Sequence, residues 1–262
     1  ELDRNGELTG SRHKVARDEP PATAKRLRPA KRHGLSRRTI PFAGSAAPSS
    51  PQTGGTASDG PLLADTPVTT RNIPVILINF SDTTPTYSAA DFATLLFASG
   101  NWSFKDFYEE VSRGAFTVTP GPPGVQGWFT ASGTHDYYGQ RSGWGPPDKW
   151  PGDLVYEAVF QADPAVDFSA YDFDGDCVVD VVAIIHQGPA QEASGVATDI
   201  WSQSWSLSST YGYGLSHHPP YLTNGVCPSD PGRFMTVDDY IMMPETLPAN
   251  LDPGIATIGV FA

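Results

Sequence analysis

The hydrophobic pattern of the chain changes abruptly near residue 73. Before this point Leu, Ile, Val and Phe are sparse, and residues 42–60 are mostly Gly, Ser, Ala, Pro and Thr. Such a segment cannot bury enough apolar surface to offset its conformational entropy. We therefore expect residues 1–70 to be a largely disordered leader, either a linker or the tail of a pro-region, and residues 71–262 to be folded.

The folded part opens with a strand and two helices. Residues 73–80 form a nearly continuous apolar run, which is typical of a strand buried on both faces. Ser88 stands three residues before Asp91, as in a capping box, and predicts a helix start. A second helix is predicted after Ser103 and before Gly114, with apolar positions at helical spacing: Phe104, Phe107, Tyr108 and Val111.

The remaining pattern alternates strands and a helix. Strands are predicted at 116–119, 128–129, 178–185, 200–205 and 239–243, and a third helix at 152–161 with Leu154, Val155, Ala158 and Val159 facing inward. An aromatic and Gly-rich loop is predicted at 206–232. Asp252–Pro253 supplies an N-cap and a Pro at the first helical position, so a last helix is predicted from there to Ala262. This order indicates an α/β or α+β fold, a mixed twisted sheet with covering helices.

Charge divides the chain at about the same place as hydrophobicity. The first 40 residues carry a net charge of +6 and the remaining 222 carry −18. An acidic body argues against nucleic acid as a partner, because phosphate binding needs Lys and Arg patches. No run of about 18 apolar residues is present, so no membrane span is expected. Few lysines, many acids and much Gly, Pro, Ser and Thr suit a secreted protein that holds calcium.

The most specific local motif is the acidic run at 172–180. It resembles the first nine positions of an EF-hand loop, with carboxylates at positions 1, 3, 5 and 9 and a backbone carbonyl at position 7. Cys177 occupies position 6, normally Gly, and Ala183 occupies position 12, normally Glu, so the run is not an EF-hand. We predict a shorter calcium loop; an acidic turn held by its own Asx hydrogen bonds is the alternative. The expected calcium ligands are Asp172, Asp174, Asp176, Val178 and Asp180.

The two cysteines, Cys177 and Cys227, leave two alternatives open. In a cytosolic protein they would be free thiols, whereas in a secreted protein a disulfide between them would close a loop worth about 4 kcal/mol of chain entropy. The sequence contains no C-x-x-C, so neither a thiolate zinc site nor a redox motif is expected.

Motifs of other enzyme classes are missing from these 262 residues: there is no G-x-S-x-G, no P-loop and no H-E-x-x-H. His186 ends a predicted buried strand, where we expect it to be hydrogen-bonded. The neighbours His217 and His218 are expected in a solvated loop, with a substitute metal site as the alternative. The acids at 238–239 and Glu245 flank a predicted strand and are either a second calcium site or surface charge.

Several segments, taken together and in order, resemble the secreted zinc metalloproteases of the immune inhibitor A family. The first are Asn79-Phe80-Ser81-Asp82, Ser103 to Ser112, and Gly127-Trp128-Phe129. They continue with Tyr171 to Asp180, Ile200-Trp201-Ser202, Tyr240 to Glu245, and Ile255 to Ala262. Each piece is loose alone, but the ordered set is specific and covers about residues 73–262.

The resemblance implies a zincin-like N-terminal subdomain of a secreted, monomeric, calcium-stabilised endopeptidase acting on proteins or peptides. It assigns the loop aspartates to calcium. In the family the segment corresponding to residues 258–262 leads into H-E-x-x-H, which binds zinc and carries the general base. We therefore expect no catalytic residue and no zinc ligand within this chain, and an inactive fragment. The family often has His where Gln203 stands, so Gln203 receives no role.

A function of another class stays open, a non-enzymatic secreted calcium-binding module for adhesion or carbohydrate. Its binding face would be the aromatic segment 201–221. Reading the gene beyond codon 262 distinguishes the two hypotheses, because H-E-x-x-H directly downstream would establish the protease.

Overall fold

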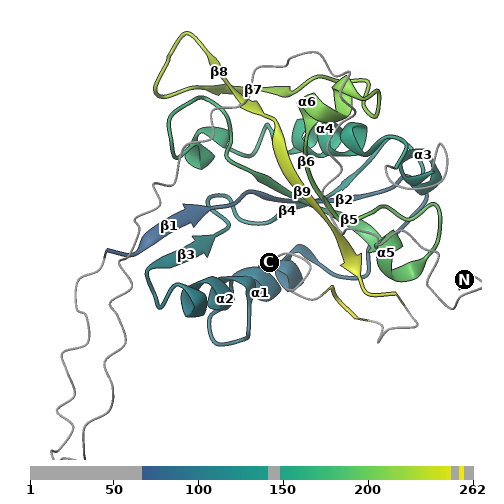
Figure 1. Cartoon of the computed structure of the whole chain (residues 1–262), viewed down its shortest axis with the longest axis horizontal. Helices are drawn as coiled ribbons and strands as arrows, with labels where there is room; N and C mark the ends of the chain where they lie inside the picture. The colour runs from purple at the N-terminus through teal and green to yellow at the C-terminus, as the bar shows by residue number, and fades with distance from the viewer. Residues whose placement is uncertain (1–66, 141–147, 249–253, 257–262) are drawn as a thin grey trace, which may run out of the picture. The chain divides into compact units, whose positions relative to one another are not determined.

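The computed structural model describes residues 67–140, 148–248 and 254–256 (Figure 1). The predicted leader up to residue 66 and the predicted last helix from residue 257 onward therefore lie outside the described residues. The first described element is β1 (Thr69–Asn72), and the last long strand is β9 (Asp239–Thr246).

A five-stranded mixed sheet forms the centre of the described residues, as predicted. The strands lie in the order β4-β2-β5-β9-β6. β2 pairs in parallel with β4 and β5, β5 pairs in parallel with β9, and β6 alone is antiparallel, against β9. The bounds are β2 (Val75–Asn79), β4 (Gln126–Thr130), β5 (Val182–Pro189) and β6 (Gln203–Ser206). The sheet therefore ends at β6, with an antiparallel edge.

Two smaller ladders flank this sheet in the described chain. β1 pairs in parallel with β3 (Phe116–Thr119), and β7 (Tyr221–Val226) pairs antiparallel with β8 (Phe234–Val237). The second ladder corrects the sequence prediction, because part of it and α6 (Leu207–Gly212) lie inside the segment predicted to be a loop. The strands of this ladder acquire a buried face only when they pair with each other. The alternation of apolar and polar residues in the sequence was therefore too weak to predict them.

The capping box predicted at Ser88 is present, and Ser103, predicted only to start the next helix, forms a second one. Ser88 caps α1 (Ala89–Phe97), and its hydroxyl accepts from the backbone N–H of Asp91, whose carboxylate accepts from the N–H of Ser88. Ser103 and Asp106 form the same reciprocal pair at α2 (Phe104–Val111). Each box satisfies two backbone donors that a helix start otherwise leaves unpaired.

The predicted apolar face of α2 is only partly buried. Phe104 is buried, but Phe107 is 39% exposed and Val111 is 60% exposed. Helical spacing correctly places these side chains on one stripe, but the described part of the chain covers only the N-terminal end of it. The apolar spacing therefore identifies the stripe but not how much of it is buried.

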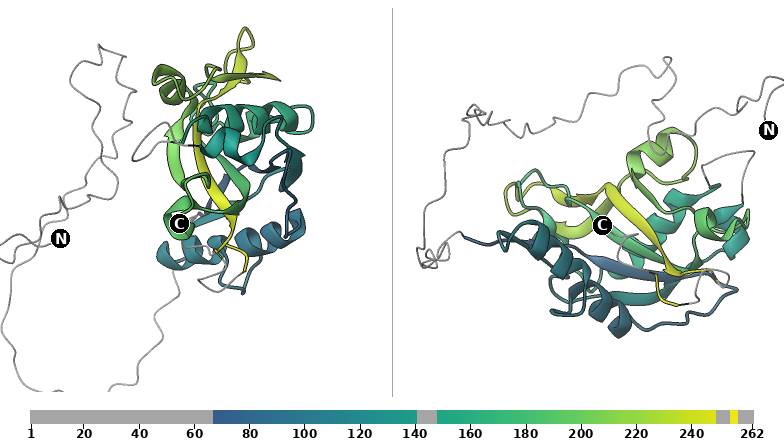
Figure 2. Two further views of the ribbon diagram at one scale, coloured as in Figure 1. Left: turned by 90° about the vertical axis from the view of Figure 1, so that its right-hand side faces the viewer. Right: turned by 60° about the horizontal axis from the view of Figure 1, so that its bottom comes forward.

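Both faces of the sheet are covered, by different helices (Figures 1 and 2). On one face Ile76, Ile184 and Met242 belong to a core that includes α4 (Pro151–Ala162). On the other, alternate residues of the same strands pack with α1 and α2. All five residues of β2 are buried, which explains its continuous apolar run. The described residues also form shorter helices: α3 (His135–Gly139), η1 (Phe168–Tyr171) and α5 (Gln191–Ser194).

Two element boundaries differ from the sequence prediction. β5 begins at Val182 rather than Val178, because Val178 makes only an isolated bridge to Thr236. At the other end, Ile255 bridges Thr246 in an antiparallel sense, so residues 254–256 do not open a helix as predicted. No helix among the described residues is long and apolar enough to cross a membrane.

Candidate calcium loop and sheet edge

The acidic run forms a tight loop between η1 and β5. Carboxylate oxygens of Asp172, Asp174 and Asp176 lie within 4.8 Å of one another, and this is the one such group of His, Cys, Asp or Glu found in the described ranges. Three hard oxygen donors on a compact loop suit Ca²⁺, which takes six to eight oxygens. The donor set therefore fits calcium, and its remaining ligands would be a backbone carbonyl, a further carboxylate or water.

Backbone hydrogen bonds give the loop its shape. The carboxylate of Asp172 accepts from the N–H groups of Gly175 at 2.8 Å, Asp176 at 3.2 Å and Cys177 at 3.0 Å. Gly175 and Cys177 have φ values of +76° and +71°, which let the chain turn around this carboxylate. Position 6 thus has the left-handed backbone that an EF-hand assigns to Gly, although here the residue is Cys177.

Asp180 and Val178, the other two expected calcium ligands, do not belong to this group of three residues. Asp180 is outside the group of three, and its carboxylate accepts from the N–H of Phe173 at 3.3 Å, which joins the two ends of the loop. Desolvation raises the pKa of Asp180, and the Asp174 and Asp172 charges add to this rise. The Phe173 N–H and the Arg71 charge oppose it. Val178 donates its N–H to Asp176 at 2.8 Å.

A disulfide joins this loop to the β7–β8 ladder. Cys177 and Cys227 are bonded, with their Cα atoms 5.3 Å apart and a sequence separation of 50. Ser229 adds a second connection, because its hydroxyl donates to the carbonyl of Gly175 at 2.7 Å. The loop is therefore held against β8 by the bridge at Val178, and against the turn between β7 and β8 by a covalent bond and a side-chain hydrogen bond.

The acids considered as a second calcium site, at 238–239 and at Glu245, do not form one group of carboxylates. Asp239 begins β9 while Glu245 lies near its end, and Asp238 accepts from the N–H and hydroxyl of Ser208. Glu245 is fully buried and accepts from the N–H groups of Thr86, Tyr87 and Gly188. Glu245 therefore ties the loop before α1 and the end of β5 to β9, a role that residue spacing could not indicate.

The histidines are engaged in separate structural contacts. His217 pairs with the buried Asp153 at 2.6 Å and lies 4.0 Å from the Trp150 ring, whereas His218 stacks on Tyr156. Adjacent in sequence, they point to different partners, and no metal-binding group that includes histidine is found in the described residues. The described residues therefore offer a calcium donor set but no donor set suited to zinc.

His186 is fully buried inside β5, which continues to Pro189 instead of ending before His186 as predicted, and only one of its two ring nitrogens is hydrogen-bonded. Its Nδ1 lies 3.0 Å from the carbonyl oxygen of Gln187, while no residue of the described chain pairs with Nε2. Burial lowers the pKa of His186 to about 4, with the neighbouring His135 adding to the effect. The imidazole is therefore neutral near pH 7.

Hydrogen bonds with buried side chains hold β6 and the residues just before it in place. The hydroxyl of Tyr240 donates to Gln203 at 3.3 Å, and the carboxylate of Asp148 accepts from the N–H of Trp201 at 3.1 Å. Burial raises the pKa of Tyr240, so its hydroxyl stays protonated. Asp148 was not considered from the sequence, because it precedes its partners by more than 50 residues.

The aromatic segment considered as a binding face is split between core and surface. Tyr221 is buried and packs against Tyr156, whereas Tyr211 and Tyr213 are about half exposed on α6 and just after it. The ring of Trp205 lies 5.9 Å from that of Tyr213. These side chains do not form one continuous aromatic face.

Comparison with known proteins places this arrangement in a family. Residues 64–251, which run from just before β1 to beyond β9, match the family model described as the immune inhibitor A peptidase M6 catalytic domain. The curated protein Immune inhibitor A of Bacillus thuringiensis subsp. alesti is 32% identical over 165 residues, which is 55% of this chain and 22% of that protein. The chain thus spans about a fifth of that relative. The family model covers well over half of the residues of this chain, and the chain therefore belongs to the immune inhibitor A family of M6 peptidases.

Proposed function

We propose that these residues are the substrate-binding part of the catalytic domain of a secreted, calcium-stabilised zinc metalloendopeptidase. The observation that carries the proposal is the match of residues 64–251 to the M6 catalytic domain. The disulfide between Cys177 and Cys227 supports secretion, because such bonds persist in oxidising compartments.

In this proposal β6 receives the substrate. It is the antiparallel edge of the main sheet, and in the described residues its outer side pairs with no strand. An extended peptide can add to such an edge through main-chain hydrogen bonds, and this gives affinity with little dependence on sequence. A protein substrate would thus lie beside Gln203–Ser206.

Zinc would come from residues other than those described. The chain contains no H-E-x-x-H, and its described carboxylate group suits calcium rather than zinc. We assign the hydrolytic chemistry to a zinc-binding helix beyond residue 262, and expect the 262-residue chain to be inactive alone. Calcium at Asp172, Asp174 and Asp176, completed by Val178 and Asp180, would fix the loop that leads into β5.

The test compares two forms of the protein on casein. The complete gene product should cleave casein and lose this activity in 1,10-phenanthroline, with recovery on adding zinc. The 262-residue chain should cleave nothing under the same conditions. A complete gene product that lacks chelator-sensitive cleavage would contradict the proposed activity, and chelator-sensitive cleavage by the 262-residue chain would contradict the assignment of zinc.

A further inference from the structure

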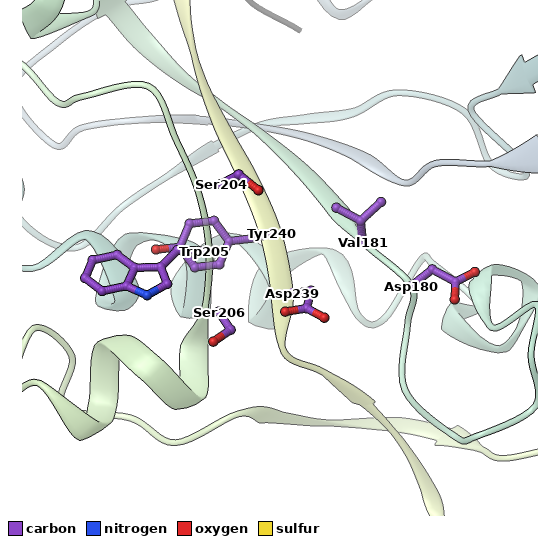
Figure 3. Close-up of a pocket in the computed structure, with 7 residues that line it drawn as sticks. All are labelled: Asp180, Val181, Ser204, Trp205, Ser206, Asp239 and Tyr240. Carbon is purple, nitrogen blue, oxygen red and sulfur yellow. The ribbon is translucent and has the colours of Figure 1, made fainter. Parts of the chain in front are cut away.

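A polar pocket of about 380 Å³ lies beside the sheet edge (Figure 3). It is lined by residues of β6, of the start of β9, and of the turn before β5: Asp180, Val181, Ser204, Trp205, Ser206, Asp239 and Tyr240. In Figure 3 the carboxylate of Asp239 lies between the β6 residues on one side and Asp180 on the other. The pocket thus starts at the strand proposed to receive substrate and runs inward across the sheet.

Strand register places the small and the charged residues on one face. Ser204 is opposite Ile241 and Ser206 is opposite Asp239 in the β6–β9 pair. Opposed residues share a face of the sheet, and alternate residues return to it. Ser204, Ser206 and Asp239 therefore share one face, while Trp205 and Tyr240 project to the other. On the shared face only two serine side chains separate the outer edge from the Asp239 carboxylate.

The charged residues that line this pocket are both acidic. Asp239 and Asp180 are exposed, no lining residue is Lys, Arg or His, and no described residue donates a hydrogen bond to the Asp239 carboxylate. Asp238 next to it is satisfied by Ser208. The pocket offers acceptors and hydroxyls and has no cationic donor of its own, which favours an ammonium or guanidinium group over a sugar or an anion.

The distances allow a long basic side chain to reach Asp239. Neighbouring strands lie about 4.8 Å apart, so a peptide added to β6 would lie about 10 Å from β9. A lysine with its four-carbon stem can cross the intervening strand above Ser204 and Ser206 and bring its ammonium group to the carboxylate. A larger side chain than serine on this face would block that path.

We propose that this pocket is a specificity subsite that accepts a Lys or Arg side chain of an extended peptide paired with β6, with Asp239 as the principal recognition residue. The inference rests on the proposed use of β6 as the substrate-binding edge. It adds a preference for basic residues at one substrate position, which edge pairing alone does not provide.

The test measures binding of fluorescein-labelled peptides to the 262-residue chain by anisotropy. The peptides share the sequence Ser-Val-X-Val-Ser-Val with blocked ends, and X is Lys, norleucine or Glu. The Lys peptide should bind about fivefold more tightly than the norleucine peptide, as expected for a partly exposed ion pair, and the Glu peptide should bind most weakly. The preference should shrink in 1 M NaCl because salt screens the pair.

Three variants distinguish recognition of Lys by this pocket from a general effect of the protein's negative charge. Asp239→Asn should remove the preference for Lys over norleucine, and Ser204→Leu should weaken binding of the Lys peptide by blocking the path without removing the Ser206 cap of α6. Glu110→Gln removes the same charge on the exposed surface of α2 and should keep the preference. Equal binding of Lys and norleucine peptides, or a preference that survives in Asp239→Asn, would overturn the subsite. Failure of every peptide to bind would overturn it together with edge pairing, whereas casein cleavage by the complete gene product is measured separately.

Discussion

Replacing His186 with leucine should remove an acid-sensitive component of the stability of this domain. The side chain is fully buried, and its pKa is lowered from 6.5 to about 4 by burial. Because the folded state binds this proton more weakly than the unfolded state, the neutral histidine contributes stability above pH 6.5. That contribution is lost as the pH falls from 6.5 toward 4. The two pKa values correspond to about 3 kcal/mol once the folded and the unfolded states are both protonated, below pH 4.

Urea denaturation at several pH values measures this effect. Between pH 7 and pH 4.5 the unfolding free energy of the parent chain should fall by about 2 kcal/mol more than that of His186→Leu, a difference that follows from the two pKa values. His218→Gln is the matched control, because it removes a histidine that stacks on Tyr156 and should leave the His186 component in place. Parallel pH profiles for the parent chain and His186→Leu would refute the reasoning.

Three further predictions concern calcium, the disulfide and a buried carboxylate. Calcium at about 100 times its dissociation constant should add about 2.7 kcal/mol to the unfolding free energy, seen as a rise in Tm, and Asp174→Ala should abolish the rise; an equal rise in that variant would exclude the site. Replacing both Cys177 and Cys227 with serine should lower the unfolding free energy by about 4 kcal/mol, the entropy of a 50-residue loop, and an unchanged urea midpoint would contradict this. Glu245→Ala should cost about 3 kcal/mol in the same assay, because three backbone N–H groups lose their acceptor, whereas Glu110→Gln on the surface should cost little.

Features set by neighbouring residues were predictable from the sequence. The capping boxes at Ser88 and Ser103 depend on a partner three residues away, so the sequence contains all of their information. The same holds for the acidic loop, where the spacing of Asp172, Asp174 and Asp176 is enough to bring their carboxylates together. The family resemblance, confirmed by the match to the M6 catalytic domain, rests on such short ordered segments.

Features set by distant partners were not predictable. Glu245 accepts from Thr86 and Tyr87, almost 160 residues earlier, so nothing near it in the sequence marks it as a buried acceptor. The β7–β8 ladder acquires its buried face only beside the acidic loop and α4. The position of the Asp180 carboxylate could not be predicted for a related reason. β5 begins two residues after Asp180, and the start of this strand, not the spacing within the loop, decides where the carboxylate lies.

The order of strands in the sheet also constrains how the chain can be assembled during synthesis. β9 is the last strand of the main sheet to leave the ribosome, yet it occupies an inner position between β5 and β6. A nascent chain that ends before Asp239 can pair β4, β2 and β5, but β6 then has no strand to join. The proposed substrate edge is therefore the last part of the sheet to exist, and any binding that needs it must wait until β9 has been made.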